Sequence, residues 1–146
     1  MPEVEGDRER LDRLAYEAQV LQGQGQSVRE QLGALAVAVA QLQAAIESLK
    51  LLKEKGKATG FVPVGAGVLA PASIGDGRVL VEVGANVLVE RPCEDALADL
   101  EARLKETMEA QERTQQGAIR LGQRLRVLDL EARGIVERMR ASSIEE

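Results

Sequence analysis

The chain has 146 residues, a formal net charge of −5, 29% charged residues and 1% aromatic residues. It contains no His and a single Cys, Cys93, which excludes His general bases, Cys–His pairs and the usual zinc ligand sets. The negative net charge disfavours binding to nucleic acid or to an acidic membrane surface. We therefore expect one domain over residues 1–146, without enzymatic activity, cofactor or metal.

Targeting signals are not apparent in the sequence. Residues 1–10 carry several acidic side chains and lack the apolar core of a signal peptide. We find no apolar run that approaches the roughly 18 residues of a membrane span, so no membrane partner is expected. A lone Cys93 cannot form an intramolecular disulfide, which favours the reducing cytoplasm. We expect Cys93 to be a small buried residue rather than a nucleophile.

A first long helix is predicted over about residues 8–55. Its apolar and small residues recur with alternating steps of three and four, the heptad spacing by which helices pair. This seam consists of Leu11, Leu14, Ala18, Leu21, Gly25, Val28, Leu32, Leu35, Val39, Leu42, Ile46 and Leu49. Lysines gather near its end and suit the negative end of the helix dipole, and Gly56 then fits a helix terminator.

Two β-hairpins are predicted over about residues 58–91. Valines alternate with other residues over 79–83 and 87–89, the period-two pattern of strands. Three glycine-rich turns, at 65–67, 75–77 and 84–86, divide the segment into four strands near 60–64, 68–74, 78–84 and 87–91. The strand and turn residues that we expect to form oligomer contacts are Val62, Val64, Gly65, Gly67, Val68, Val79, Val81, Val83, Gly84, Val87 and Val89.

The stretch VGAGVLA, residues 64–70, begins like a dinucleotide-binding fingerprint. Such a site needs a helix that opens at the glycines, so that the helix N-terminus can receive the pyrophosphate. Pro71 and the glycines at 75 and 77 leave no room for that helix. We therefore interpret Gly65 and Gly67 as turn residues of the first hairpin.

A second long helix is predicted over about residues 93–141, with the same alternating spacing. Its seam consists of Leu97, Leu100, Leu104, Thr107, Gln111, Thr114, Ala118, Leu121, Leu125, Leu128, Ala132, Ile135 and Met139. Two helices of similar length, joined by one compact segment, should fold back as an antiparallel coiled coil. That arrangement places Leu11 near Met139 and Ala18 opposite Ala132.

The four strands carry too little area for an independent core. A small sheet with open edges and an apolar face pairs readily with other chains, so we expect the strands of several subunits to join in one body. At the far ends of the helices, Leu11, Leu14, Ile135, Val136 and Met139 form an apolar tip. These residues either close the coiled coil or, where the helix ends fray, form a binding surface.

The chain resembles the α-subunit family of prefoldin, and its archaeal members in particular. The resemblance is carried by FVPVGAGVLA at 61–70, by VLVEVGANVLVE at 79–90 and by the flanking long helices. It departs from the family at Asn86, where glycine is expected, and at Val87 and Leu88, where aromatic residues are expected. Asn tolerates positive φ, so the turn is retained.

The resemblance implies an α+β fold: a long antiparallel coiled-coil hairpin with two β-hairpins between its helices. It implies two α and four β subunits, whose strands form a β-barrel body with six coiled-coil arms. The arm tips, here Leu11, Leu14, Ile135, Val136 and Met139, would hold non-native proteins without ATP and pass them to a group II chaperonin. The alternative is a coiled-coil adaptor or scaffold subunit of a prefoldin-like assembly, without chaperone activity.

Overall fold

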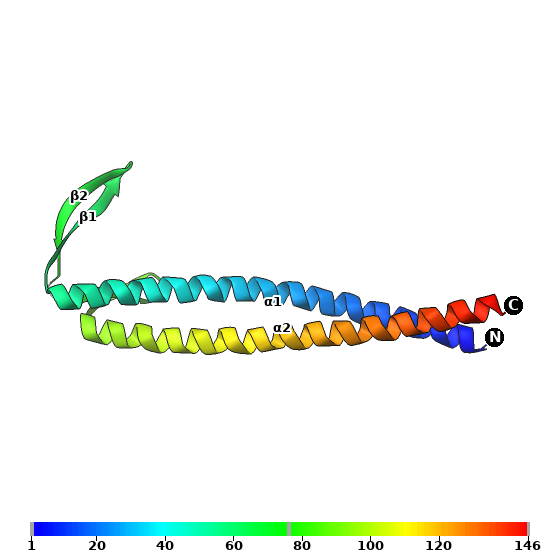
Figure 1. The fold of residues 1–146 in the computed structure, drawn as a ribbon. Coiled ribbons are helices and arrows are strands. Elements are labelled where there is room, and N and C mark those ends of the chain that lie inside the picture. The colour runs from blue at the N-terminus through cyan, green and yellow to red at the C-terminus, as the bar shows by residue number, and fades with distance from the viewer. Residues whose placement is uncertain (1, 76, 146) are drawn as a thin grey trace. The chain divides into compact units, whose positions relative to one another are not determined.

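The computed structural model describes residues 2–75 and 77–145. Its elements, in chain order, are α1 (Pro2–Lys55), β1 (Ala58–Gly65), β2 (Val68–Ile74), β3 (Arg78–Gly84), β4 (Val87–Pro92) and α2 (Cys93–Ile144) (Figure 1). The predicted order of helix, two hairpins and helix is confirmed, and so are the positions of the four strands to within two residues.

The first helix begins at Pro2 rather than near residue 8. Proline suits a first helical position because its missing N–H would have no intrahelical acceptor there, and acidic residues in the first turn favour the positive end of the helix dipole. At the other end, Gly56 has a φ of +66°, and its N–H donates to the Leu52 carbonyl at 3.1 Å. This confirms Gly56 as the helix terminator.

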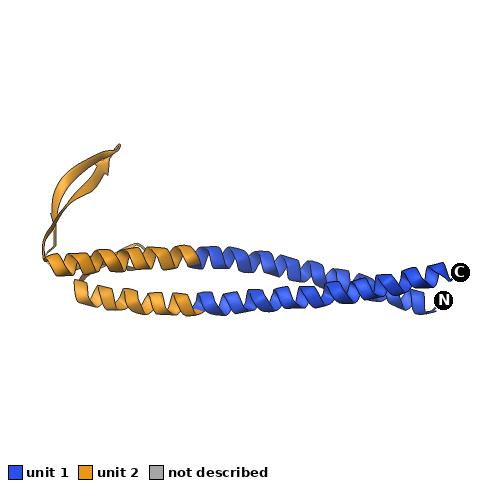
Figure 2. Cartoon of the chain, in the orientation of Figure 1, with its two compact units in different colours: residues 1–35, 110–146 blue, residues 36–109 orange. Residues whose placement is uncertain are grey.

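The chain divides into two compact units (Figure 2). Unit 1 comprises residues 1–35 and 110–146, and thus one segment of each helix. Unit 2 comprises residues 36–109, with the remaining helical segments and both β-hairpins. Each unit has its own packing and is described separately.

Unit 1 is a pair of helical segments packed through the predicted seam. Its core consists of Leu14, Leu128 and Ile135, which are 9%, 2% and 2% exposed. The partly buried residues around this core are Leu11, Ala18, Leu21, Ala132 and Met139. Leu11 and Met139 therefore belong to one cluster with Ala18 and Ala132, as the antiparallel arrangement predicts.

Ion pairs flank the core of unit 1. The Arg124 Nη2 atom lies 2.8 Å from the Glu17 Oε1 atom, and the Arg138 Nη2 atom lies 3.4 Å from the Asp7 Oδ1 atom. Each pair joins α1 to α2 at a partly exposed position. Such pairs contribute little free energy, but they favour one register of the two helices over its neighbours.

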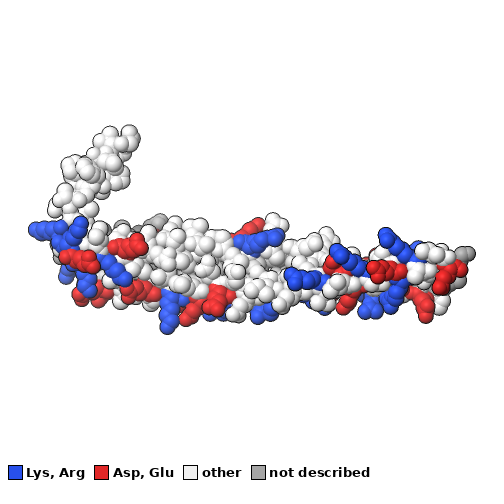
Figure 3. Space-filling model, viewed as in Figure 1, with Lys and Arg blue, Asp and Glu red and all other residues white. Residues whose placement is uncertain are grey.

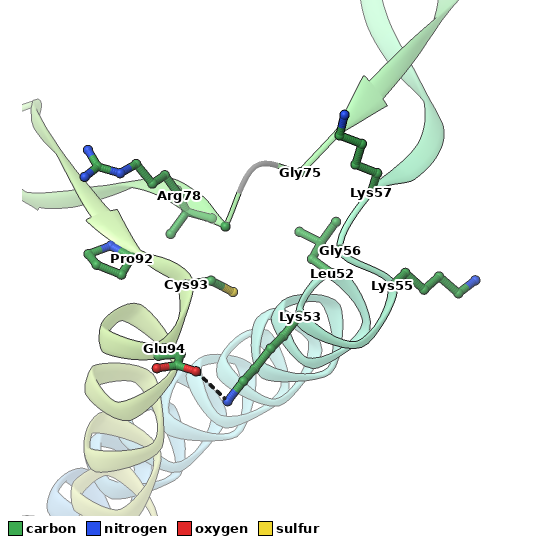
Figure 4. Close-up of a pocket in the computed structure, with 12 residues that line it drawn as sticks. Leu52, Lys53, Lys55, Gly56, Lys57, Gly75, Arg78, Pro92, Cys93 and Glu94 are labelled. Atoms are coloured by element: carbon green, nitrogen blue, oxygen red, sulfur yellow. Dashed lines mark ion pairs between the residues drawn. The ribbon is translucent and has the colours of Figure 1, made fainter.

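The helical segments of unit 2 meet beside the hairpins. Ile46, Cys93 and Ala96 are buried there, and the Cys93 thiol donates to the Leu49 carbonyl at 3.6 Å. The prediction that Cys93 is a small buried residue is thus confirmed. The Lys53 ammonium lies 3.3 Å from the Glu94 carboxylate and also joins the two helices (Figure 4).

Both predicted seams match the pattern of burial along the helices. Every seam position of α1 and α2 is buried or half-buried, whereas most positions between them are exposed. The polar seam positions include Thr107 and Thr114, whose hydroxyls donate to the carbonyls of Arg103 and Ala110. Their hydrogen-bonding groups are satisfied within α2, so these positions can lie in the seam without an unpaired polar group.

Each β-hairpin is a separate two-stranded antiparallel sheet, β1–β2 and β3–β4. In the first, Pro63 pairs with Leu69 and Gly65 with Val68, so Val64 is the extra residue of a β-bulge. The second hairpin has the same irregularity at the corresponding residue, Val83, between Glu82 and Gly84.

The two hairpins repeat one sequence. The segments VPVGAGVLA (62–70) and VEVGANVLV (81–89) are identical at six of nine positions. They have the same pairing register, the same bulge and the same two-residue turn. Two similar nine-residue segments therefore form two hairpins of the same local structure.

The hydropathy of α1 contradicts the expectation that no apolar run in the chain approaches the length of a membrane span. Helix α1 contains an 18-residue window with a mean hydropathy of 1.5 and at most two charged residues. By length and composition alone, this helix could cross a membrane. One such helix is weak evidence, because the buried core helix of a soluble protein passes the same test, although only 6% of this window is buried here. In this chain, the seam positions of α1 are buried or half-buried in a helix pair.

Candidate functional site

The glycine-rich stretch that resembles a nucleotide fingerprint is a β-turn. Ala66 and Gly67 connect β1 to β2 with φ values of +50° and +78°. Positive φ at both central residues defines a type I′ turn, whose twist matches that of the flanking strands. Ala85 and Asn86 form the corresponding turn of the second hairpin, with φ values of +51° and +60°. The predicted turn is confirmed, and Asn86 adopts the positive φ that was expected of it.

The position directly before each turn also requires glycine. Gly65 and Gly84 have φ values of +126° and +114°, a region that side chains with a Cβ rarely adopt. A Cβ at either position would meet open space, so the requirement is one of backbone conformation alone. The turns therefore fix the register, and the register fixes which side chains each hairpin presents.

Both hairpins present apolar side chains to solvent. Among the predicted contact residues, the exposed valines are Val62, Val64, Val68, Val83, Val87 and Val89, while Val79 and Val81 are half-buried. The most exposed of these valines is Val64, at 64%, and Phe61 of the same strand is 71% exposed. The first hairpin has no charged residue from Ala58 to Ile74 (Figure 3). Two-stranded sheets of this kind are marginally stable alone and suit pairing with another sheet.

The connection between the hairpins is tied to the ends of both helices. A Cβ on Gly75 would lie 2.6 Å from the Gly56 carbonyl oxygen, so only glycine fits without a shift of the backbone. The Cys93 N–H donates to the Gly77 carbonyl at 2.8 Å. The third predicted turn spans residues 75–77, of which Asp76 lies outside the described residues. The close approach at Gly75 was not predicted, because it depends on a contact distant in sequence.

A cavity of about 790 Å³ lies at this junction in unit 2 (Figure 4). The end of α1, the start of β3 and the start of α2 all contribute residues to it. Its charged lining residues are Lys53, Lys55, Lys57, Arg78 and Glu94. Lys53 and Glu94 form an ion pair with each other, and Arg78 lies 3.5 Å from Glu90. The cavity is open to solvent, and three of its five charged residues, Lys53, Arg78 and Glu94, take part in these ion pairs.

The structure places the predicted tip residues in two different environments. Leu14 and Ile135 are buried in the core of unit 1, and Leu11 and Met139 are half-buried against that core. Val136 alone is exposed, at 38%. Leu11, Leu14, Ile135 and Met139 therefore close the coiled coil in this conformation. A partner could reach them only if the two helices separated locally.

Other apolar side chains of unit 1 are exposed without any such opening. Tyr16 and Ile144 are 71% and 84% exposed, and Ile119, Val127 and Leu130 lie on the outer side of α2, away from its seam. No role was predicted from the sequence for Ile119, Val127 and Leu130. A second spacing of three and four residues, through Ile119, Gln123, Val127 and Leu130, was the signal that could have identified them.

A metal site can be assessed for the described residues only. Within 2–75 and 77–145, no group of three or more His, Cys, Asp or Glu side chains is arranged to hold a metal ion. What the chain presents instead is a helix pair and two β-hairpins with open edges and exposed apolar residues. These features define a class of proteins in which two long paired helices are joined by β-hairpins.

Comparisons with known proteins agree with this class. The family profile named Prefoldin, described as a prefoldin subunit, matches residues 21–132. The prefoldin subunit alpha of Pyrococcus horikoshii is 36% identical over 138 residues, covering 92% of this chain and 93% of the relative. The prefoldin subunit alpha 1 of Thermococcus kodakarensis is 37% identical over 102 residues, covering 68% of this chain and 70% of the relative.

A solved structure is also similar. The filamentous prefoldin of Methanocaldococcus jannaschii has a TM-score of 0.66 and 28% sequence identity, and it covers 80% of this chain and 99% of its own. The chain belongs to the prefoldin family, and the relatives from Pyrococcus horikoshii and Thermococcus kodakarensis are named α subunits. The resemblance inferred from the two glycine-turn segments and the flanking helices is thereby confirmed.

Proposed function

We propose that this chain is the α-type subunit of an ATP-independent chaperone that holds non-native proteins and passes them to a group II chaperonin. Membership of the prefoldin family supports a chaperone role and assembly with other prefoldin subunits. The proposed assembly is supported by the two hairpins, which expose apolar residues on open-edged sheets. In the proposal, these strands join those of four β subunits and of a second α subunit in a β-barrel body.

The proposed contact with client proteins lies at the helix tips in unit 1. Val136, Tyr16 and Ile144 are available without any change in the helix pair, because each of them is exposed. Leu11, Leu14, Ile135 and Met139 would become available on local separation of the helix ends. Apolar side chains among charged neighbours suit non-native chains, which expose apolar segments of varied sequence.

The test uses the complex reconstituted with β subunits and a denatured client whose aggregation is followed by light scattering. Replacing Tyr16, Val136 and Ile144 together by Ser should weaken protection, because it removes exposed apolar contacts without entering the core. The matched control is Val37→Ser, an exposed α1 position in unit 2 that is 58% exposed. Equal protection by the triple variant and the control would contradict the tip assignment.

Removal of residues 1–15 and 134–146 is a stronger but less specific test. We expect this truncation to abolish protection while the complex keeps its mass, since the hairpins lie in unit 2. It also removes Leu14 and Ile135 from the core, so the point variants are needed to separate binding from stability. A complex of the full-length chain that assembles normally but gives clients no protection would favour the adaptor alternative.

Transfer to the chaperonin is tested separately. A client held by the complex should move to a group II chaperonin on mixing, followed by co-migration of labelled client with the chaperonin. We expect this to take place in the cytoplasm, where Cys93 remains reduced. Stable retention of the client by the complex, with chaperonin in excess, would contradict the transfer step.

A further inference from the structure

Helix α2 contains a basic stretch, although the chain as a whole has a net charge of −5. Residues 113–128, RTQQGAIRLGQRLRVL, include four arginines and no acidic residue, and Glu112 and Asp129 bound the stretch. It lies within unit 1 (Figure 2). Residues 18–35, the part of α1 in the same unit beyond the tip, carry one basic and one acidic side chain, so they do not balance the charge.

Three of these four arginines have no counter-charge within the described chain. Arg124 is paired with Glu17, as described above. Among the residues that the structure describes, no carboxylate forms an ion pair with Arg113, Arg120 or Arg126. All three are exposed. An exposed guanidinium without a partner presents a planar set of N–H donors that fits a carboxylate of another molecule.

Apolar residues lie on the same side of α2 as these arginines. Ile119 and Arg126 are seven residues apart and therefore share one position of the seven-residue repeat. Arg113, Arg120 and Val127 share the next position. Both positions lie on the outer side of a paired helix, away from its seam. Ile119 and Val127 are 53% and 44% exposed, and we call these five residues the basic–apolar face.

We infer that the basic–apolar face binds an acidic amphipathic helix of another protein. Ile119 and Val127 are eight residues apart, about two helical turns, so a partner helix with apolar residues at the same interval can cover both. Glu or Asp side chains beside those apolar residues would pair with the three arginines. This face is distinct from the tip residues, and the inference does not depend on the chaperone proposal.

The composition of the face favours a protein partner over a nucleic acid. Single-stranded nucleic acids bind through aromatic side chains that stack on bases, and the two aromatic residues of the chain, Tyr16 and Phe61, both lie outside α2. A long polyanion would also meet the acidic remainder of the chain, whose net charge opposes its binding. A short acidic helix meets only the local positive charge.

The test measures binding of a labelled model peptide to the full-length chain by fluorescence anisotropy. The peptide has about 16 residues, the length of the basic stretch, with leucines at seam spacing and glutamates beside them. We expect it to bind, with an affinity that falls as salt is added. A peptide with lysines in place of the glutamates, and one with serines in place of the leucines, should both bind more weakly.

Two variants test the face itself. Replacing Arg113, Arg120 and Arg126 together by Gln should weaken binding about tenfold, since each exposed ion pair contributes a factor of about two. Replacing Ile119 and Val127 together by Ser should also weaken it, because the apolar contact is lost. All five side chains are exposed, so circular dichroism should show unchanged helix content.

The matched control replaces Arg8, Arg10 and Arg13 by Gln, which removes the same charge from exposed positions of α1 and should leave the affinity unchanged. Absence of peptide binding, equal loss in the control, or equal binding of the serine peptide would each overturn the inference. Tighter binding of a single-stranded oligonucleotide than of the acidic peptide would overturn it as well. Client protection by the complex with β subunits is measured separately, so failure of this inference and failure of the chaperone proposal are distinguishable.

Discussion

Replacement of Leu128 by Ala should destabilise unit 1, whereas replacement of Leu130 should not. Leu128 is 2% exposed and lies in the core with Leu14 and Ile135, while Leu130 is 64% exposed on the same helix. Loss of three buried carbon groups costs about 2.4 kcal/mol at roughly 0.8 kcal/mol each. The space left behind would join a surface groove of about 660 Å³ that Leu128 already lines, so the additional cavity cost is small. We expect a total loss of about 2–3 kcal/mol.

The assay is urea unfolding followed by circular dichroism, with hydrogen exchange to locate the change. Leu130→Ala should shift stability by less than about 0.5 kcal/mol, because the side chain is exposed and Ala is a good helix former. In Leu128→Ala, loss of amide protection should concentrate in the segments of unit 1 that pack against the core. Equal midpoints for the two variants would refute the assignment of Leu128 to the core and the seam on which it rests.

Three further substitutions probe other parts of the fold. Gly75→Ala should destabilise the hairpin junction by about 1–3 kcal/mol, because the φ of Gly75 is +119° and a Cβ would meet the Gly56 carbonyl oxygen. Thermal unfolding measures this loss, and an unchanged melting temperature would contradict it. Gly33→Ala should stabilise α1 by up to about 1 kcal/mol, since a Cβ meets open space in a helix; a lower urea midpoint would argue against this. Glu17→Gln should cost no more than about 0.5 kcal/mol by removing the partly exposed pair with Arg124, and the difference should vanish in 1 M salt.

The helices and strands could be predicted from the sequence because their periods are local. Alternating steps of three and four placed every seam residue correctly, and β-branched alternation with glycine turns placed the four strands. The turn at Ala66 and Gly67 was predictable for the same reason, since the absence of a following helix is visible within ten residues. The start of α1 at Pro2 was missed, because acidic residues with little apolar periodicity give a weak helix signal.

The remaining features depend on contacts between distant segments. Gly75 was expected only as a turn residue, but the nearby Gly56 carbonyl is what excludes any side chain there. For the tip residues the sequence left two roles open, closing the coiled coil or binding a partner, and the structure buries Leu14 and Ile135 in the core between the helices. The spacing of apolar residues does not predict how close to the helix ends the seam residues remain buried. The client-binding role of these residues and the role of the strand valines in a barrel stay predictions.

The two kinds of apolar surface in this chain obtain their stabilisation from different sources. The seam residues of α1 and α2 are covered within the chain, so the helix pair can fold without a partner. The hairpins are not covered, since Phe61, Val64 and Leu80 remain at least 64% exposed. A two-stranded sheet alone is marginally stable, so ordering of the hairpins must be linked to association. Weakened assembly should therefore appear first as lost amide protection in β1–β4, while the helix content is retained.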